Sequence, residues 1–450
     1  MAEKKSQTKL SRRDFLLMTG SAALGMAVSS CQIASKQTKT PTVADNFLHK
    51  SGQTNQINKS TNTVEATESP SPSETPRPAT IRELADALGV KIAIYLGSHR
   101  LHDAQFVNTA LSIGNELIIS DDLFCRYIYS DVNWRRILDN WEFVQEEFAT
   151  GSIPYDDQIK WDPWGRGEAG GLIDFAQKRN MSVVVDSLLW SEDVPESVLS
   201  GGFSREELRK IAEFMVKSKV LKFKGLVREW SVISESVARN LWGDSKTAFW
   251  ERKLGYPQIV FDAFIWAREV DPIGSLNLIE DTLDPTDDAR SQALNATLSL
   301  LVSLRENNIP VDGISFENNF WIFAPPRQEQ VKETIQYIQQ LGYKIGHAQS
   351  TVVISDEWPI WKSRARTVQL VSDKLEAQAR IYREIFEIYI ETGSDFGFYG
   401  VTDADSWYVH HGEPNADPYI IDKDFQPKLA YFAMLEVLQK HYEQHYSNDF

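Results

Sequence analysis

Residues 205–236 read REELRKIAEFMVKSKVLKFKGLVREWSVISES, a charged helix-forming segment followed by a short run of β-branched and apolar residues. The same order recurs in five other places: IRELADAL before VKIAIYL, GGLIDFAQKRN before MSVVVDSLLW, SQALNATLSLLVSLRENN before VDGISF, QEQVKETIQYIQQLG before YKIGHAQSTVV, and QARIYREIFEIYIETG before DFGFYGVTD. This alternation is typical of βα units on a parallel sheet. The count reaches about eight strands when LSIGNELII and SLNLIED are included, which suits a closed barrel.

The predicted fold class is therefore α/β, a (β/α)8 TIM barrel within residues 80–450. A doubly wound open sheet is the alternative, but no glycine-rich phosphate loop follows the first strand. In a barrel of this kind, catalytic side chains lie where strands end and loops begin. The side chains expected at these strand ends are Tyr95, Asp186, Trp190, Ser234, Glu235, Glu317, Asn319, Gln349, Asp403 and Trp407.

The composition excludes several classes of protein. The chain has 47 basic and 63 acidic side chains, a net charge of −16, which argues against nucleic acid as a partner. Its only cysteines are Cys31 and Cys125, too few for a disulfide scaffold or a cysteine-rich metal site. The histidines form no HxH or HExxH pattern, so neither a metal nor a cofactor is expected. Aromatic residues make up 11% of the chain, and their flat faces suit the binding of sugars as well as core packing.

The N-terminus predicts export. Residues 1–31 carry basic residues before a short apolar stretch, Ser11 to Leu16 resembles a twin-arginine signal, and Val28 to Cys31 resembles a bacterial lipoprotein cleavage box. Lipidation of Cys31 would anchor the protein at the cell surface or the extracytoplasmic face of the membrane. The alternatives are an uncleaved anchor and a charged N-terminus that arose by chance. Residues 32–79 are rich in Ser, Thr and Pro and are expected to form a disordered linker.

Six motifs follow one another along residues 80–450. They are MSVVVDSLLW (181–190), KGLVREWSVISE (224–235), AFIWAREVDP (263–272), PVDGISFENN (310–319), GVTDADSW (400–407) and QPKLAY (426–431). In this order and spacing they resemble the glycoside hydrolase family 10 β-xylanases. The resemblance implies a TIM barrel and retaining hydrolysis by two carboxylates, one an acid/base and the other a nucleophile.

The resemblance places Glu235 at the acid/base position and Gln349 at the position of the nucleophile. The structural, non-catalytic alternative for Glu235 is a side chain that only caps the next helix or pairs with an arginine. A neutral amide cannot form the glycosyl ester, so Gln349 argues against simple xylanase chemistry. Glu317 stands where the family has a glutamine, and this gained carboxylate is a candidate to compensate; Asp186 is a further spare acid.

Other expected substrate-binding positions differ from the family or match it only in part. Asp186 replaces a family histidine, Ser234 an asparagine, Asn319 a histidine and Tyr399 a tryptophan. The resemblance also implies substrate contacts at the following positions: Lys160, Trp161, Trp190, Asp403 and Trp407.

Three functions remain open at this point. The first, which we favour, is an exported, lipid-anchored and monomeric glycoside hydrolase that cleaves O-glycosidic bonds of xylan or a related plant polysaccharide through Glu235. The second is a polysaccharide-binding lipoprotein whose catalysis is impaired by Gln349. The third is a structural protein that only retains the barrel.

Overall fold

The computed structural model describes residues 79–163, 168–281, 283–285, 287–355 and 372–447. The predicted signal (1–31), the lipidation site Cys31 and all but the last residue of the predicted linker (32–79) lie outside the described residues. Within the described ranges, no helix combines the length and the hydropathy needed to cross a bilayer.

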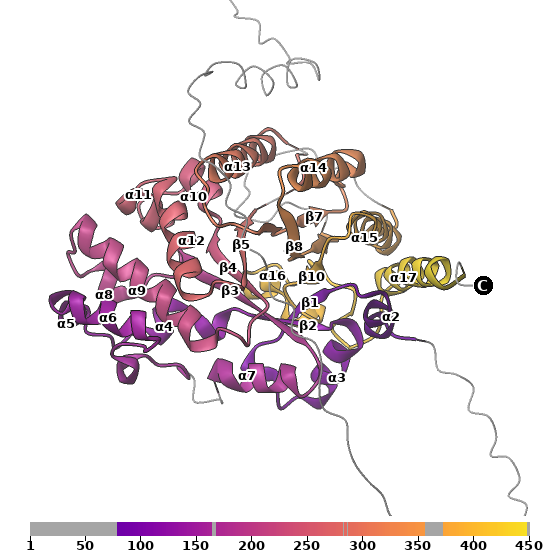
Figure 1. The fold of residues 1–450 in the computed structure, drawn as a ribbon. Coiled ribbons are helices and arrows are strands. Elements are labelled where there is room, and N and C mark those ends of the chain that lie inside the picture. Colours follow the sequence, from indigo (N-terminus) through magenta and orange to yellow (C-terminus); the bar gives the residue numbers. More distant parts are fainter. Residues whose placement is uncertain (1–78, 164–167, 282, 286, 356–371, 448–450) are drawn as a thin grey trace, which may run out of the picture. The chain divides into compact units, whose positions relative to one another are not determined.

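The predicted (β/α)8 barrel is confirmed. Its parallel strands follow the order β10-β1-β2-β3-β4-β5-β6-β8 (Figure 1). Backbone hydrogen bonds from Asp395 to Ile345 (3.4 Å) and from Ser350 to Gly397 (2.9 Å) join the two ends of this sheet, so the doubly wound alternative is wrong. The strands are β1 (Ile92–Tyr95), β2 (Glu116–Ile119), β3 (Ser182–Trp190), β4 (Glu229–Ser234), β5 (Ser275–Glu280), β6 (Gly313–Phe316), β8 (Lys344–Ala348) and β10 (Phe396–Phe398).

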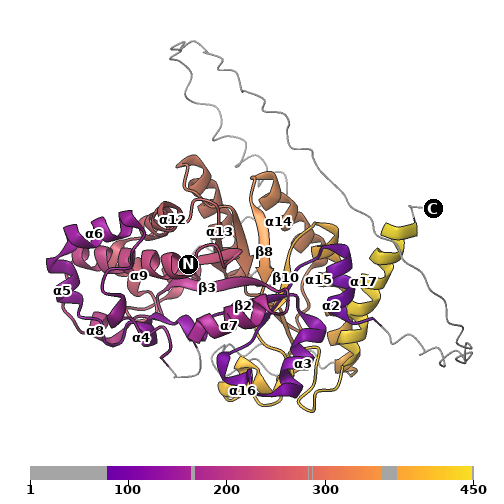
Figure 2. The ribbon, with the colours of Figure 1, turned by 60° about the horizontal axis from the view of Figure 1, so that its bottom comes forward.

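Helices surround the strands, as Figures 1 and 2 show from two directions. The helix before β4 begins at a capping box, in which Ser204 and Glu207 each accept the other's backbone N–H, an arrangement that contributes about 1 kcal/mol. The helices are α2 (Ile81–Leu88), α3 (Ala104–Ile113), α4 (Cys125–Ile128), α5 (Trp134–Asp139), α6 (Trp141–Thr150), α7 (Glu168–Gln177), α8 (Glu196–Leu199), α9 (Arg205–Phe223), α10 (Ser236–Trp242), α11 (Phe249–Leu254), α12 (Gln258–Val270), α13 (Asp288–Glu306), α14 (Gln328–Gln340), α15 (Lys374–Glu391), α16 (Trp407–His410) and α17 (Leu429–Ser447).

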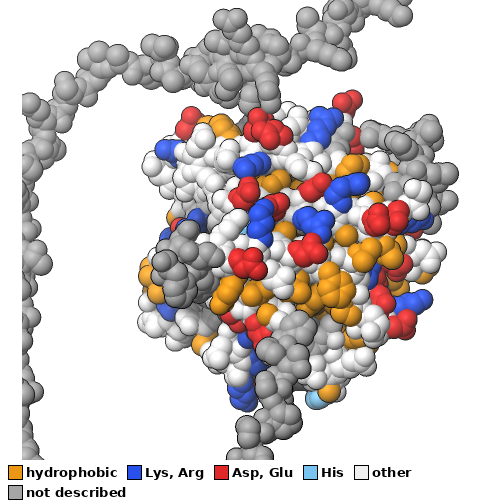
Figure 3. Space-filling view, turned by 90° about the vertical axis from the view of Figure 1, so that its right-hand side faces the viewer, with side chains coloured by type: hydrophobic (Ala, Val, Ile, Leu, Met, Phe, Trp, Pro, Cys, Tyr) orange, Lys and Arg blue, Asp and Glu red, His pale blue; other side chains and the backbone are white. Residues whose placement is uncertain are grey.

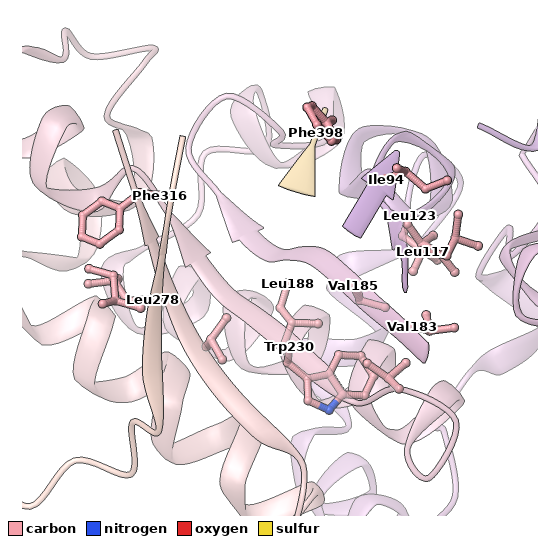
Figure 4. Packing of buried hydrophobic residues seen from close by; sticks show 14 of the residues in the cluster. Ile94, Leu117, Leu123, Val183, Val185, Leu188, Trp230, Leu278, Phe316 and Phe398 are labelled. Carbon is pink, nitrogen blue, oxygen red and sulfur yellow. The ribbon is translucent and has the colours of Figure 1, made fainter. Parts of the chain in front are cut away.

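The strands are buried on both of their faces, which explains why they appear in the sequence as continuous apolar runs. Figure 4 shows Val183, Val185 and Leu188 of β3 near Trp230 of β4. All four side chains are at most 2% exposed, and the Trp230 indole donates to Asp271 at 3.0 Å. Apolar packing of this kind fixes the barrel wall on which the polar site is built.

Part of the barrel interior is polar, and a bulge in β8 shapes it. Ile314 pairs with Ile345 and Phe316 with Ala348, so two residues, Gly346 and His347, lie opposite one. A Cβ atom at Gly346 would lie 2.3–2.7 Å from side chains of the interior, so only glycine fits there. The bulge thereby leaves room for the buried His347 beneath the barrel mouth.

A second, two-stranded sheet continues beyond the ends of β6 and β8. It consists of β7 (Asn319–Trp321) paired in parallel with β9 (Thr351–Val353). Trp321, Val353, Tyr408 and Ala416 form a small apolar core on it. The segment YKIGHAQSTVV, predicted as one strand, is therefore divided at Gln349 and Ser350.

One face of the molecule carries apolar side chains next to charged ones (Figure 3). The exposed large apolar side chains of the chain include Leu375 on α15 and Leu429 and Phe432 on α17. Nothing in the structure tests the predicted monomer, so this expectation stays a prediction.

Candidate active site

Glu235 lies in the turn between the end of β4 and the start of α10. Its backbone adopts a left-handed conformation (φ 54°), and its backbone N–H donates to Ile279 of β5 at 2.8 Å. A non-glycine residue in this conformation costs about 1–3 kcal/mol, so the surrounding strands must hold it there. Its side chain forms no hydrogen bond that caps α10, so the first of the two structural alternatives, helix capping, is wrong.

The Glu235 carboxylate is held by donors from two elements. The Trp190 indole donates to Oε2 at 2.7 Å, and Arg239 donates to the same oxygen through Nε at 3.1 Å and through Nη2. Glu235 is therefore paired with an arginine, as the second structural alternative predicts, but this pair is half-buried and lies at a strand end. Oε1 receives none of these bonds.

The environment of Glu235 favours its protonated form. Burial raises the pKa of Glu235, and the negative charge of Asp281 adds to this effect. The Arg239 charge and the Trp190 hydrogen bond oppose it. A carboxyl group whose pKa is raised can keep a proton near neutral pH and deliver it to a leaving group.

Gln349 and Asp186 meet across the barrel mouth. Gln349 Nε2 donates to Asp186 Oδ2 at 2.6 Å, and Ser234 Oγ donates to Asp186 Oδ1 at 3.5 Å. Burial raises the pKa of Asp186, while the charge of His347 and these two hydrogen bonds oppose the rise. A carboxylate from β3 therefore lies beside the amide of Gln349, which the sequence resemblance aligned with the nucleophile.

Glu317 follows β6 and is half-buried. Burial, together with the charges of Glu235, Asp186 and Asp281, raises the pKa of Glu317 well above its usual range. In the part of the chain that the structure describes, no donor or cation bonds its carboxylate. Glu317 is thus the carboxyl group of this cluster with the strongest reason to be neutral.

His347 supports the site from below. Its Nδ1 lies 2.8 Å from Glu229 Oε1, and among the described residues its buried Nε2 has no hydrogen-bond partner. The pKa of His347 is raised: burial lowers it, but the contact with Glu229 outweighs this. The pKa of Glu229 is lowered because the imidazole and Arg228 outweigh its own burial. Sequence reasoning missed this pair; a histidine within an otherwise buried strand was the available signal.

Tyr399 follows β10, which lies between β8 and β1 in the barrel, and its ring stacks on that of Tyr95 with centroids 4.7 Å apart. Its hydroxyl donates to Ser120 Oγ at 3.0 Å and to Asp121 Oδ1 at 3.2 Å. Burial raises the pKa of Asp121. Asp121 was also missed, although an acidic residue two positions after the apolar run of β2 was a visible signal.

Lys160 and Trp161 are not brought to the strand ends. Trp161 is buried against Phe223, the last residue of α9, on the outside of the barrel wall, and its indole donates to Asp156 at 2.7 Å. Lys160 pairs with Asp131 at 2.7 Å. The pattern at 156–161 matched the family motif in letters, but these contacts of Lys160 and Trp161 are with residues outside the strand ends.

Of the other expected binding residues, Asn319 and Asp403 are engaged within the protein. Asn319 Oδ1 accepts from Thr351 and Tyr408, both at 2.8 Å. Asp403 pairs with Lys428 at 2.9 Å, and burial raises the pKa of Asp403 to about 6.

Trp407, by contrast, is 42% exposed and stacks on His411 with centroids 3.9 Å apart. Across the described ranges, no group of three acidic, histidine or cysteine side chains is placed to hold a metal.

Comparison with known proteins agrees with this fold and indicates a family. The model of glycosyl hydrolase family 10 matches residues 150–437, more than half of the chain. Endo-1,4-beta-xylanase B of Thermotoga neapolitana is 29% identical over 292 residues, which cover 63% of this chain and 79% of that protein. Beta-1,4-xylanase of Dictyoglomus thermophilum is 27% identical over 299 residues, which cover 63% of this chain and 81% of that protein.

Solved structures show the same fold. Xylanase 10B from Thermotoga maritima superposes with a TM-score of 0.62 at 23% identity, covering 81% of this chain and 99% of that one. Xylanase 10B from Thermotoga petrophila RKU-1, solved with xylobiose, superposes with a TM-score of 0.63 at 22% identity. The match covers 82% of this chain and 100% of that one. The chain therefore belongs to glycosyl hydrolase family 10 and is a glycoside hydrolase of the endo-1,4-β-xylanase-like kind.

Proposed function

We propose that this protein is an exported, lipid-anchored hydrolase that cleaves O-glycosidic bonds of xylan or a related plant polysaccharide, with Glu235 as its acid/base. The observation that carries the proposal is the place of Glu235: a carboxyl group only 15% exposed, directly after β4, in a barrel whose relatives are xylanases. The proton would lie on Oε1, the oxygen free of Trp190 and Arg239, and would pass to the glycosidic oxygen as its bond to C1 breaks.

Asp186 is the better supported partner for Glu235. Two donors, Gln349 and Ser234, stabilise its carboxylate form, and it lies within hydrogen-bond distance of the family nucleophile position. Burial raises the pKa of Asp186 as well, but that of Glu317, the other candidate, is raised well above its usual range, and among the described residues no hydrogen bond stabilises the Glu317 carboxylate. Glu317 is therefore less suited to attack C1 or to activate water. In this proposal Asp186 either attacks C1 directly or takes a proton from the attacking water.

The test is reducing-sugar release from xylan by the wild type and by Glu235→Gln, Asp186→Asn and Glu317→Gln. We expect Glu235→Gln and Asp186→Asn each to lower the rate by about 10²–10⁴-fold, and Glu317→Gln to retain most of it. Proton NMR of the first product will show whether the anomeric configuration is retained or inverted. If the wild type released sugar no faster than Glu235→Gln, the proposal that Glu235 serves as the acid/base of hydrolysis would be contradicted.

One observation favours a second function, binding with impaired catalysis. The amide of Gln349 leaves the family nucleophile position without a charge of its own. A binding protein would hold xylo-oligosaccharides with the same affinity in the wild type and in Glu235→Gln, and would release no sugar. Isothermal titration of both proteins, run beside the rate assay, separates the two functions.

Export and anchoring rest on the sequence of residues 1–31. We expect Cys31→Ala to move the protein from the membrane fraction to the soluble fraction, and Arg12→Lys with Arg13→Lys to retain it in the cytoplasm. Sedimentation of the purified protein tests the proposed monomer.

A further inference from the structure

Arg239 is bonded at both ends of its guanidinium group. It lies one helical turn after Glu235, and its Nε and Nη2 both donate to Glu235 Oε2. Its remaining nitrogen, Nη1, lies 2.5 Å from Glu192 Oε1, just beyond β3. A planar guanidinium bonded in this way holds one fixed orientation, which an ammonium group cannot reproduce.

Trp190 completes this clamp. Its indole donates to the oxygen that Arg239 also bonds, and the guanidinium carbon lies 5.9 Å from the centre of its ring. The Arg239 side chain is only 20% exposed, so solvent screens its charge less than that of a surface arginine. The Glu235 carboxylate is consequently fixed through Oε2 by residues of both β3 and α10.

Acidic side chains of the described residues also act on Glu235. Asp281 after β5 and Glu317 after β6 both act on it, and Glu280 of β5 also senses its charge. The positive charge of Arg239 also acts on Glu251 of α11, where it opposes the rise in pKa that burial causes. In the described part of the chain, Arg239 is the cation that forms an ion pair with Glu235 against this acidic surrounding.

We propose that Arg239 is a positioning residue that fixes the orientation of the Glu235 carboxylate and sets the pH range in which Glu235 gains and loses its proton. The inference rests on the proposed function insofar as that proton is used in glycoside cleavage. Glu192 has the opposite influence, because it shares the Arg239 charge and adds a negative charge of its own.

Two substitutions should therefore act in opposite directions. Arg239→Gln removes the cation, so the pKa of Glu235 should rise by about 1 or more, as expected when an opposite charge in contact is lost. Glu192→Gln leaves Arg239 to Glu235 alone, so the pKa of Glu235 should fall. Arg239→Lys keeps the charge without the paired donors, so the pKa should stay near the wild-type value while kcat falls.

The experiment measures Glu235 directly and its use in catalysis separately. Full-length protein with ¹³C-labelled glutamate is titrated by NMR, and the Glu235 signal is identified by its loss in Glu235→Gln. The pH dependence of kcat/KM on xylan is recorded in parallel. When Glu235 is the acid, the alkaline limb of this profile should move up in Arg239→Gln and down in Glu192→Gln. Arg209→Gln, which breaks a comparable ion pair with Asp262 on α12, is the matched control and should move neither.

An unchanged Glu235 titration in both Arg239→Gln and Glu192→Gln would overturn the inference, even where activity falls. The NMR titration does not depend on turnover. A wild type that releases no sugar would therefore end the proposed function alone, and opposite NMR shifts would still support the role of Arg239.

Discussion

At the scale of single residues, the pairing of Gln349 with Asp186 decides where negative charge is tolerated. Gln349→Glu would place a second carboxylate within hydrogen-bond distance of Asp186 Oδ2. Two carboxylates at this distance cannot both ionise, so the pKa of one must rise above its unfolded value. The resulting loss of stability is absent below about pH 4 and grows as the pH rises, reaching about 1–3 kcal/mol near neutral pH.

Denaturant unfolding of the wild type and Gln349→Glu across this pH range measures the effect. The double variant Gln349→Glu with Asp186→Asn is the control, because the new amide at 186 can donate to the new carboxylate. It should recover most of the lost stability, and its rate on xylan should exceed that of the single variant. Equal stability of Gln349→Glu and the wild type at every pH would contradict this account of the pair.

Glu317 gives a second prediction at this scale. Its pKa is raised well above the usual range in the folded protein, so the folded state loses stability relative to the unfolded chain as the pH rises above about 4. Glu317→Gln removes this penalty while keeping the shape of the side chain. We expect it to raise the free energy of unfolding by about 1–3 kcal/mol near neutral pH and to have no effect near pH 4. Glu306→Gln, at an exposed helix end, should change neither value.

At the scale of elements, the bulge of β8 places His347 against Glu229 inside the barrel. Because the pKa of His347 is raised, the stability from this pair is fully present below the unfolded histidine pKa and is lost as the pH rises through the folded one. The lowered pKa of Glu229 limits the window at its acidic end, near the unfolded glutamate pKa.

We therefore expect His347→Gln to cost about 2–4 kcal/mol of unfolding free energy at about pH 6, and less at about pH 9. Urea unfolding at the two pH values tests this expectation, with the exposed His102→Gln as the control. A cost that does not change between the two values would mean that His347 contributes by packing rather than by its charge.

The elements also show how far the sequence alone leads. Helix and strand periodicity predicted the barrel, since each strand is buried on both faces and each helix on one. The break between β8 and β9 was not predictable, because a bulge depends on the partner strand and on the space that Gly346 leaves. The sequence also placed Lys160 and Trp161 among the substrate-binding residues for a related reason. A match to a sequence motif does not determine where the loop that carries it lies relative to the barrel. Arg239 was visible four residues after Glu235, but only its contact with Glu192 indicates what it does.

At the scale of the whole molecule, charge bears on the choice of substrate. The net charge is −16, and Asp186 and Asp281 add acidic groups at the site, beside Glu235 and Glu317 whose raised pKa favours the neutral form. An acidic site repels an acidic polymer but not a neutral one, and the repulsion is screened by salt. Uncharged stretches of xylan are therefore the expected substrates, rather than stretches that carry uronic acids.

This argument predicts opposite salt responses for two polymers with the same backbone. Raising the ionic strength from about 0.01 M to about 0.15 M shortens the screening length from roughly 30 Å to roughly 8 Å. We expect kcat/KM on a uronate-bearing xylan to rise about 3- to 10-fold over this range. On a neutral arabinoxylan it should change by less than about 2-fold, which controls for effects of salt on the enzyme itself. Initial rates on the two polymers, measured side by side, test the prediction. If kcat/KM responded equally to salt on both polymers, the acidic groups at the barrel mouth would exert no repulsion on the polysaccharide. Substrate choice would then depend on shape and contacts alone.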